Sequence, residues 1–254
     1  MKRLQHLLGA SIVALAVPFG AAHAVPTAAD IVFIVDESGS MATEQDFLND
    51  IITDLDTELG NAGVGSRRYG VVGFGGNVSN PDETPRDATG GSGLTSKANA
   101  ETALGALTTF GGTEDGWLAI QYAIDNFSFA ADAAINFILA TDEDRDNLGN
   151  NSLTVGGIKD ELNQLGAVLN AVVDSDLQDG NGNSALGIDN TGEAYLADGS
   201  GGFTTSSGGV AVSGDGSTID DYVNVALDTN GAAWDLNQLR AGGDLSDSFT
   251  QAFL

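Results

Sequence analysis

Three oxygen-bearing side chains stand at alternate positions directly after an apolar segment of the chain. The segment Ile31–Val35 has five apolar, mostly β-branched residues, and Asp36, Ser38 and Ser40 follow it. Such a run predicts a strand buried on both faces of a parallel sheet, and ligands bind at the carboxyl ends of such strands. One carboxylate and two hydroxyls within one tight turn are donors that hard divalent cations prefer. The pattern therefore favours a cation site.

Two later segments place further oxygen donors after predicted elements. Thr113 stands where a Gly-rich loop meets the start of a predicted helix, and Asp142 follows the apolar run Ala134–Ala140. Each residue also has an ordinary interpretation. Thr113 is a suitable N-cap for the helix, and an acidic turn after a strand is usually a solvated loop.

The Asp-x-Ser-x-Ser pattern at Asp36, Ser38 and Ser40, with Thr113 and Asp142 later in the chain, resembles the von Willebrand factor A domain family. In that family a metal-ion-dependent adhesion site (MIDAS) begins with this pattern. The resemblance implies that the three hydroxyls contact the ion, and that the two aspartates act directly or through waters. It implies Mg²⁺ as the cation, with Mn²⁺ or Ca²⁺ as alternatives. Each motif alone is common in a chain this rich in Asp, Ser and Gly, but together and in this order they are specific.

The resemblance also implies a function. Two carboxylates only just balance a divalent ion, so the ion stays electrophilic and keeps one position for an exchangeable ligand. A carboxylate of a protein partner can take that position, which is the family's usual mode of adhesion. Glu37 and the acidic run 143–146 add negative charge near the rim of the site. An acidic partner is therefore expected only if the ion or Arg145 offsets the repulsion.

A second candidate calcium site has oxygen side chains at alternate positions. Its residues are Asp174, Asp176, Asp179, Asn181 and Asn183. However, Ser184 stands where an EF-hand loop needs glycine, and Asn190 stands where it needs a bidentate glutamate. A plain turn is the alternative interpretation.

Strands and helices alternate along most of the chain. Apolar runs predict strands at 31–35, 68–74, 134–140, 167–173 and 232–236. Helical spacing of apolar residues, with capping residues, predicts helices at 47–59, 97–107, 117–124, 155–165, 219–227 and 245–254. This order predicts an α/β fold with a doubly wound, mainly parallel central sheet flanked by helices. Such a fold is Rossmann-like. The Gly-, Asn- and Asp-rich stretch 174–217 is expected to be an insertion or an elaborated loop, with short β-like pieces at 193–196 and 210–212.

The first 24 residues have the pattern of a signal peptide. Lys2 and Arg3 precede an apolar run, and Ala22-His23-Ala24 offers a cleavage site. We therefore expect an exported protein, secreted, periplasmic or on the cell surface, whose single von Willebrand factor A domain covers residues 25–254 without a transmembrane span. That part has seven basic and 36 acidic residues, a net charge of −29. Such a charge repels phosphate backbones, so nucleic-acid binding is not expected.

The residue types that are missing narrow the function further. The chain has no cysteine, and its two histidines, His6 and His23, both lie in the predicted signal peptide. This excludes Ser-His-Asp and Cys-His catalysis and imidazole or thiolate zinc sites from the remaining chain. We therefore expect a binding domain and no enzyme. The alternatives are an acidic structural matrix or surface protein stabilised by cations, and a Mg²⁺-dependent phosphoryl-transfer hydrolase. The hydrolase would need a second carboxylate two residues after the first, where the chain has Ser38.

Overall fold

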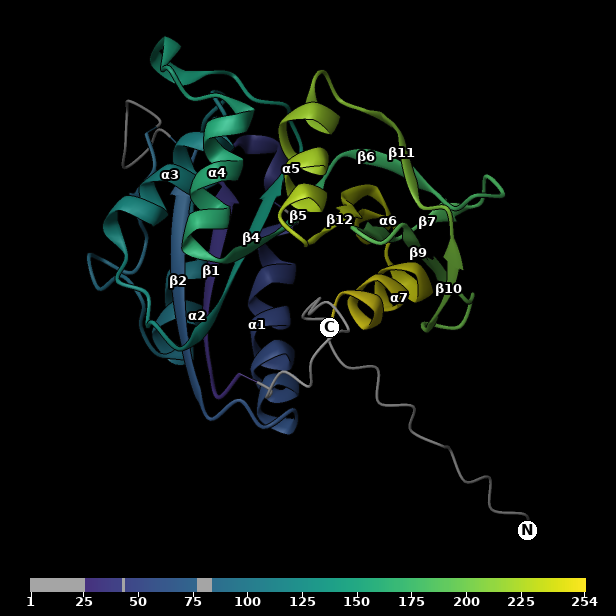
Figure 1. Ribbon diagram of the computed structural model, residues 1–254, viewed down its shortest axis with the longest axis horizontal. Coiled ribbons are helices and arrows are strands. Elements are labelled where there is room, and N and C mark those ends of the chain that lie inside the picture. Colours follow the sequence, from purple (N-terminus) through teal and green to yellow (C-terminus); the bar gives the residue numbers. More distant parts are fainter. Residues whose placement is uncertain (1–25, 43, 77–83) are drawn as a thin grey trace.

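The strand β1, Ala28–Asp36, lies inside the main sheet between two parallel neighbours, and all nine of its residues are buried. It pairs in parallel with β2, Ser66–Phe74, on one side and with β4, Ala133–Thr141, on the other. The computed structural model describes residues 26–42, 44–76 and 84–254 (Figure 1). The predicted signal peptide lies outside these residues.

Seven α-helices and nine further strands make up most of the rest of the described fold. The helices are α1 Glu44–Asn61, α2 Lys97–Leu104, α3 Gly116–Asn126, α4 Val155–Leu165, α5 Asn224–Asp228, α6 Leu236–Arg240 and α7 Gly243–Phe253. The further strands are β3 Arg86–Asp87, β5 Ala167–Val173, β6 Ser175–Gln178, β7 Ser184–Ala185, β8 Gly187–Asp189, β9 Glu193–Ala197, β10 Phe203–Ser207, β11 Val210–Gly214 and β12 Ala232–Asp235. A π-helical turn, Ile219–Val223, leads into α5.

The main sheet has nine strands in the order β10-β9-β8-β12-β5-β4-β1-β2-β3. The five strands from β12 to β2 are parallel, whereas β3 and the strands β8 to β10 run antiparallel to their neighbours. Because parallel strands need crossovers, helices cover both faces of this part. The structure thus confirms the predicted doubly wound, mainly parallel sheet.

Alternate residues of β1 contribute to two separate hydrophobic cores. Val32 and Ile34 pack with α3, α4 and α5, whereas Phe33 and Val35 pack with α1, α2, α6 and α7. This alternation follows from the two-residue period of a strand. Since Ile31–Val35 are all apolar, this part of the strand is stable only where both faces are covered, and the carboxyl end of the strand is held firmly below the loops.

The predicted helices are present, and α2 and α4 have capping residues at their ends. Ser96 caps α2 by accepting a hydrogen bond from Asn99 N, and Thr154 caps α4 by accepting one from Gly157 N at 3.1 Å. Gly166 ends α4 in the left-handed conformation, with φ 69°. The short helix α6 was not predicted, because five residues are too few to show a helical period.

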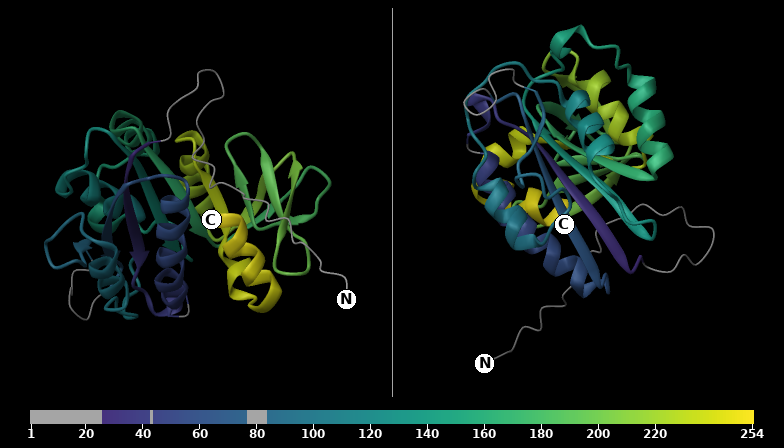
Figure 2. Two further views of the ribbon diagram at one scale, coloured as in Figure 1. Left: turned by 90° about the horizontal axis from the view of Figure 1, so that it is seen from below. Right: turned by 90° about the vertical axis from the view of Figure 1, so that its left-hand side faces the viewer.

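The stretch 174–217 contains the two expected β-like pieces, as β9 and β11, and four further strands that were not expected. Its strands β8 to β10 extend the central sheet, and β6, β7 and β11 form a second, three-stranded sheet. In Figure 2 (left) α7, in yellow, lies between the parallel part of the sheet and these green strands, and α7 contacts β8, β9 and β10. The stretch is thus largely sheet rather than loop. Among the described residues, no helix is both long enough and apolar enough to cross a membrane.

Candidate metal centre

Asp36 is the fully buried end of β1, and hydrogen bonds fix its carboxylate. Ser38 N donates to Oδ1 at 2.6 Å, and Thr141 Oγ1 donates to Oδ2 at 2.9 Å. The side chain of Gln45 donates to the Asp36 carbonyl. Burial raises the pKa of Asp36 to about 7, although these hydrogen bonds lower it. A nearby cation would relieve this cost, because it stabilises the ionised form.

The hydroxyls of Ser38 and Ser40 and the carboxylate of Asp142 form a row of oxygen atoms beside Asp36. Ser38 Oγ lies 3.0 Å from Ser40 Oγ, and Ser40 Oγ donates to Asp142 Oδ1, also at 3.0 Å. In an octahedral Mg²⁺ site with ligands at 2.0–2.1 Å, neighbouring ligand atoms are about 3.0 Å apart. The two separations from Ser40 Oγ therefore match those between neighbouring ligands of one Mg²⁺ ion.

Thr113 lies at the same edge of the sheet, on the loop before α3. A Cβ atom on Gly75 would lie 3.1 Å from Asp36 Oδ1 and 3.7 Å from the Thr113 carbonyl oxygen, so both residues face one small space. Asp115, and not Thr113, caps α3, since it accepts a hydrogen bond from Leu118 N. The N-cap interpretation of Thr113 was therefore wrong. Within the described residues, no hydrogen bond joins the Thr113 hydroxyl to the other four candidate ligands.

Arg240, at the end of α6, contacts the candidate site and was not predicted. Its Nη2 donates to Asp142 Oδ2 at 2.8 Å, and its Nε donates to Glu44 Oε1 at 2.5 Å. Nη2 also lies 3.3 Å from the Ser40 carbonyl oxygen. Nothing in the sequence around position 240 indicates this role, because the contacts join residues 98 to 200 positions apart.

Two charged residues expected at the rim have other roles. Glu37 is buried and accepts hydrogen bonds from Arg86 at 2.6 Å and Thr108 N at 2.7 Å, so its charge is compensated internally. Arg145 forms two hydrogen bonds with the buried Asp115. Arg145 therefore does not offset charge at the rim as the sequence suggested, and Arg240 is the arginine that touches the candidate ligands.

The candidate calcium loop beginning at Asp174 does not bring its carboxylates together. Asp174 accepts from Asn237, and Asp176 accepts from Ser213. The carboxylate of Asp179 accepts from the side chain of Ser206 and from both the backbone and the side chains of its own turn, residues 181 and 183. These donors, led by the backbone N–H of residue 183, lower the pKa of Asp179. Its oxygen atoms are already satisfied, so the plain-turn interpretation fits and the calcium loop does not.

The protein is a doubly wound α/β domain, and a row of oxygen donors at the carboxyl edge of its parallel strands forms a candidate cation site. Comparison with known families gives the same class. The model of the von Willebrand factor type A domain matches residues 30–183, which is more than half of the chain. The protein belongs to this family.

Solved structures show more distant similarity. Proximal thread matrix protein 1 from the mussel byssus is 19% identical, with 58% of this chain and 38% of that chain aligned and a TM-score of 0.44. An aerotolerance-related membrane protein from Bacteroides fragilis is 13% identical over 88% of this chain and 99% of its own, with a TM-score of 0.46. A von Willebrand factor type A structure from Catenulispora acidiphila is 22% identical over 58% of this chain and 33% of its own, with a TM-score of 0.39. One structure of the mussel protein has zinc in its MIDAS motif. No curated protein sequence matches the chain.

Proposed function

We propose that this domain binds a protein partner through a divalent cation held by Asp36, Ser38, Ser40, Thr113 and Asp142. The observation that carries this proposal is the row of oxygen atoms from Ser38 to Asp142, spaced at 3.0 Å. This spacing favours Mg²⁺, with Mn²⁺ next and Ca²⁺ less well suited because its ligands stand further apart. Thr113 completes the set as the third hydroxyl, on the loop that faces Asp36.

The ion would be open to a partner on the solvent side. Ser38 is buried, whereas Ser40 is exposed and Asp142 is half-buried, so the row of donors leads from the interior to the surface. A carboxylate of the partner would complete the coordination shell of the ion. Catalysis is not part of this proposal, because position 38 offers a neutral hydroxyl where a hydrolase would need a general acid.

An exposed aromatic residue stands beside the candidate site. Phe110 is 62% exposed, the largest exposed fraction among the large apolar residues of the described chain. It belongs to the loop whose Thr108 and Thr109 approach the loop of Glu37 and Gly39. Buried aromatic anchors contribute much of the affinity of protein interfaces. We therefore place Phe110 in the partner interface, next to the ion.

Titration calorimetry with Mg²⁺, Mn²⁺ and Ca²⁺ tests the metal part of the proposal. Ser40→Ala should weaken Mg²⁺ binding by about tenfold or more, because it removes one of the proposed direct ligands. Ser200→Ala is the matched control, since Ser200 is also exposed and its hydroxyl donates to Asp198 at 2.9 Å. Equal affinity of the two variants for every cation would contradict the proposed site.

Partner capture tests the binding part. Proteins from the exported fraction of the source cells should be retained by the immobilised chain in Mg²⁺ and released by a chelator. The Ser200→Ala chain should retain them and the folded Ser40→Ala chain should not. If cations merely stabilise an acidic structural protein, Ser40→Ala would lower the unfolding temperature in Mg²⁺. It would then not change the amount of protein that the immobilised chain retains. We also propose export through the N-terminal 24 residues, and N-terminal sequencing of the exported protein tests it.

A further inference from the structure

Glu114, the residue after Thr113, is a buried carboxylate without a partner. Its side chain is 0% exposed, and within the described residues neither Oε1 nor Oε2 has a hydrogen-bond partner. A buried carboxyl group is stable only if it is paired, coordinates a metal or takes up a proton, and burial, with the nearby Asp36 and Glu143, raises the pKa of Glu114 to about 9. The neighbouring Asp115, by contrast, accepts hydrogen bonds with both carboxylate oxygens, from Arg145, Asn151 and the backbone. The position of Glu114 therefore needs a separate explanation.

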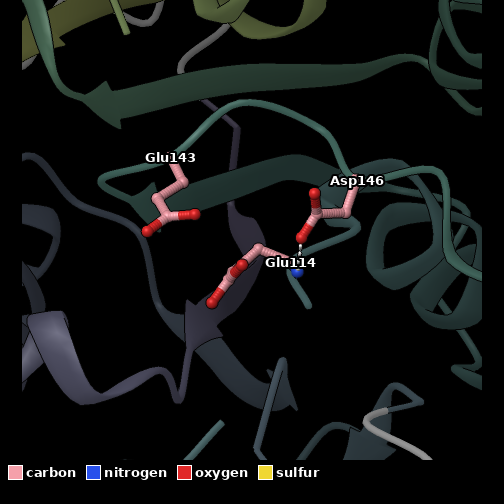
Figure 3. Close-up of side chains that lie close together, drawn as sticks. All are labelled: Glu114, Glu143 and Asp146. Carbon is pink, nitrogen blue, oxygen red and sulfur yellow. Dashed lines mark hydrogen bonds between the residues drawn. The ribbon is translucent and has the colours of Figure 1, made fainter. Parts of the chain in front are cut away.

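Two further carboxylates face Glu114. Oxygen atoms of Glu114, Glu143 and Asp146 all lie within 4.8 Å of one another, and Figure 3 shows the three side chains close together on two loops. Three points no more than 4.8 Å apart share a centre within about 2.8 Å of each, which is close to the 2.3–2.6 Å of calcium–oxygen bonds. Glu143 and Asp146 are exposed, so water can supply further ligands.

The two loops are joined so that this arrangement is held in place. Asp146 N donates to the Glu114 carbonyl at 2.8 Å, and Glu114 N donates to Asp146 Oδ2 at 2.9 Å. This reciprocal pair leaves Asp146 Oδ1 and the whole carboxylate of Glu114 for a ligand. No lysine or arginine forms an ion pair with any of the three carboxylates in the described part of the chain.

We propose that Glu114, Glu143 and Asp146 bind a second cation, Ca²⁺, beside the site at Asp36. Three carboxylates and a span of up to 4.8 Å favour the larger, more flexible coordination of Ca²⁺ over the tight octahedron of Mg²⁺. Glu114 follows Thr113 and Glu143 follows Asp142, so the second ion would fix the two loops that carry these candidate ligands. Its binding would thus prepare the first site. The proposal depends on the three carboxylates alone and holds whether or not the first site takes a metal.

Calcium titration of the metal-free full chain, by calorimetry, tests this site. Glu114→Gln keeps the size of the side chain and removes its charge, and Glu143→Gln does the same at an exposed ligand whose replacement does not endanger the fold. Glu58→Gln, an exposed carboxylate near the end of α1, is the matched control. Both site variants should weaken one Ca²⁺-binding step by about tenfold or more, whereas the control should match wild type. Ca²⁺ should also raise the unfolding temperature of wild type and the control by more than that of Glu114→Gln.

The same titration separates this site from the one at Asp36. Loss of a Ca²⁺ step in Glu114→Gln and Glu143→Gln, but not in Ser40→Ala, supports the second site even if the first proposal fails. Calcium affinity and stoichiometry in both glutamine variants equal to those of Glu58→Gln would overturn it. A Ca²⁺ step that disappears only in Ser40→Ala would overturn it as well, because all calcium would then bind at the first site.

Discussion

Arg240 and Asp142 form an ion pair at the edge of the candidate metal centre, with 2.8 Å between Nη2 and Oδ2. The other oxygen of Asp142 accepts a hydrogen bond from Ser40, so the carboxylate is held between a positive charge and the row of hydroxyls. Burial alone would lower the pKa of Arg240, but its hydrogen bonds to Glu44 and Asp142 raise this pKa above its ordinary value. The guanidinium therefore stays charged, and it repels a cation while it orients one of that cation's ligands.

Arg240→Gln should consequently tighten Mg²⁺ binding several-fold at low ionic strength. Removal of a nearby positive charge favours the ion by Coulomb's law, and salt should reduce the gain. Mg²⁺ titrations at two salt concentrations measure both effects. Weaker binding in Arg240→Gln would instead show that its orientation of Asp142 matters more than its charge. Arg67→Gln is a suitable control, because Arg67 pairs with Asp56 on α1, away from the candidate ligands.

Gly75→Ala should weaken cation binding beyond what its effect on stability explains. Gly75 has φ +75°, so any side chain strains the backbone, and its Cβ would lie 3.1 Å from Asp36 Oδ1 and 3.4 Å from Glu114 Cγ. Gly63→Ala introduces similar strain at φ +91°, but there nothing lies within 4 Å of the new Cβ. Both variants should lose about 1–2 kcal/mol of stability in denaturant unfolding. Only Gly75→Ala should also lose Mg²⁺ affinity, and equal affinities would count against a site beside Gly75.

Alanine substitutions of two phenylalanines should have different effects on stability and on partner binding. Phe137 is fully buried in β4, and Phe137→Ala should lower the free energy of unfolding by about 3–5 kcal/mol. Phe110 is 62% exposed, so Phe110→Ala should change that free energy by no more than about 0.5 kcal/mol. If Phe110 anchors the partner, its removal should nevertheless reduce the amount of partner captured in Mg²⁺. Undiminished capture would place the interface elsewhere.

The stability of the protein should depend on pH through Asp235, the N-cap of α6. Burial raises the pKa of this carboxyl to about 6, against the lowering effect of hydrogen bonds from Gln238 and Asn237. The folded state therefore holds the proton more tightly than the unfolded state does. Stability from this group is fully present below the ordinary value of 3.8 and is lost as the pH rises through 6.

Asp235→Asn removes this dependence. The free energy of unfolding of the variant, relative to wild type, should therefore rise by up to about 3 kcal/mol between pH 4 and pH 7. Urea unfolding at several pH values measures the difference, in which the contributions of the other carboxylates cancel. A constant difference would show that the pKa of Asp235 is the same in the folded and the unfolded state.

The parallel part of the fold follows from local sequence pattern. The apolar runs of β1, β4 and β5 are long enough to identify buried strands, and Ser96, Thr154 and Gly166 mark helix ends through their own side chains or lack of one. The strands β8 to β10 gave a weaker pattern, because each has only three to five residues and they are interspersed with Gly, Ser and Thr. Their place in the central sheet depends on packing with α7 rather than on periodicity.

Of the candidate metal centre, the sequence indicated the positions of the ligands but not their neighbours. Asp36, Ser38 and Ser40 lie in one turn, so their proximity is local. The contact of Arg240 with Asp142 joins residues 98 positions apart, and no pattern in the chain predicts it. Glu114 was overlooked for a related reason, since an isolated glutamate in an acidic chain gives no indication that it is buried and without a partner.

The two edge strands of the central sheet affect how the protein should behave at high concentration. The outermost strands are β3, with two residues, and β10, with five. Exposed edges invite other chains to add strands, and short edges offer few free N–H and C=O groups for this purpose. Together with the strong negative charge, these short edges should keep copies of the chain from assembling edge to edge into fibres.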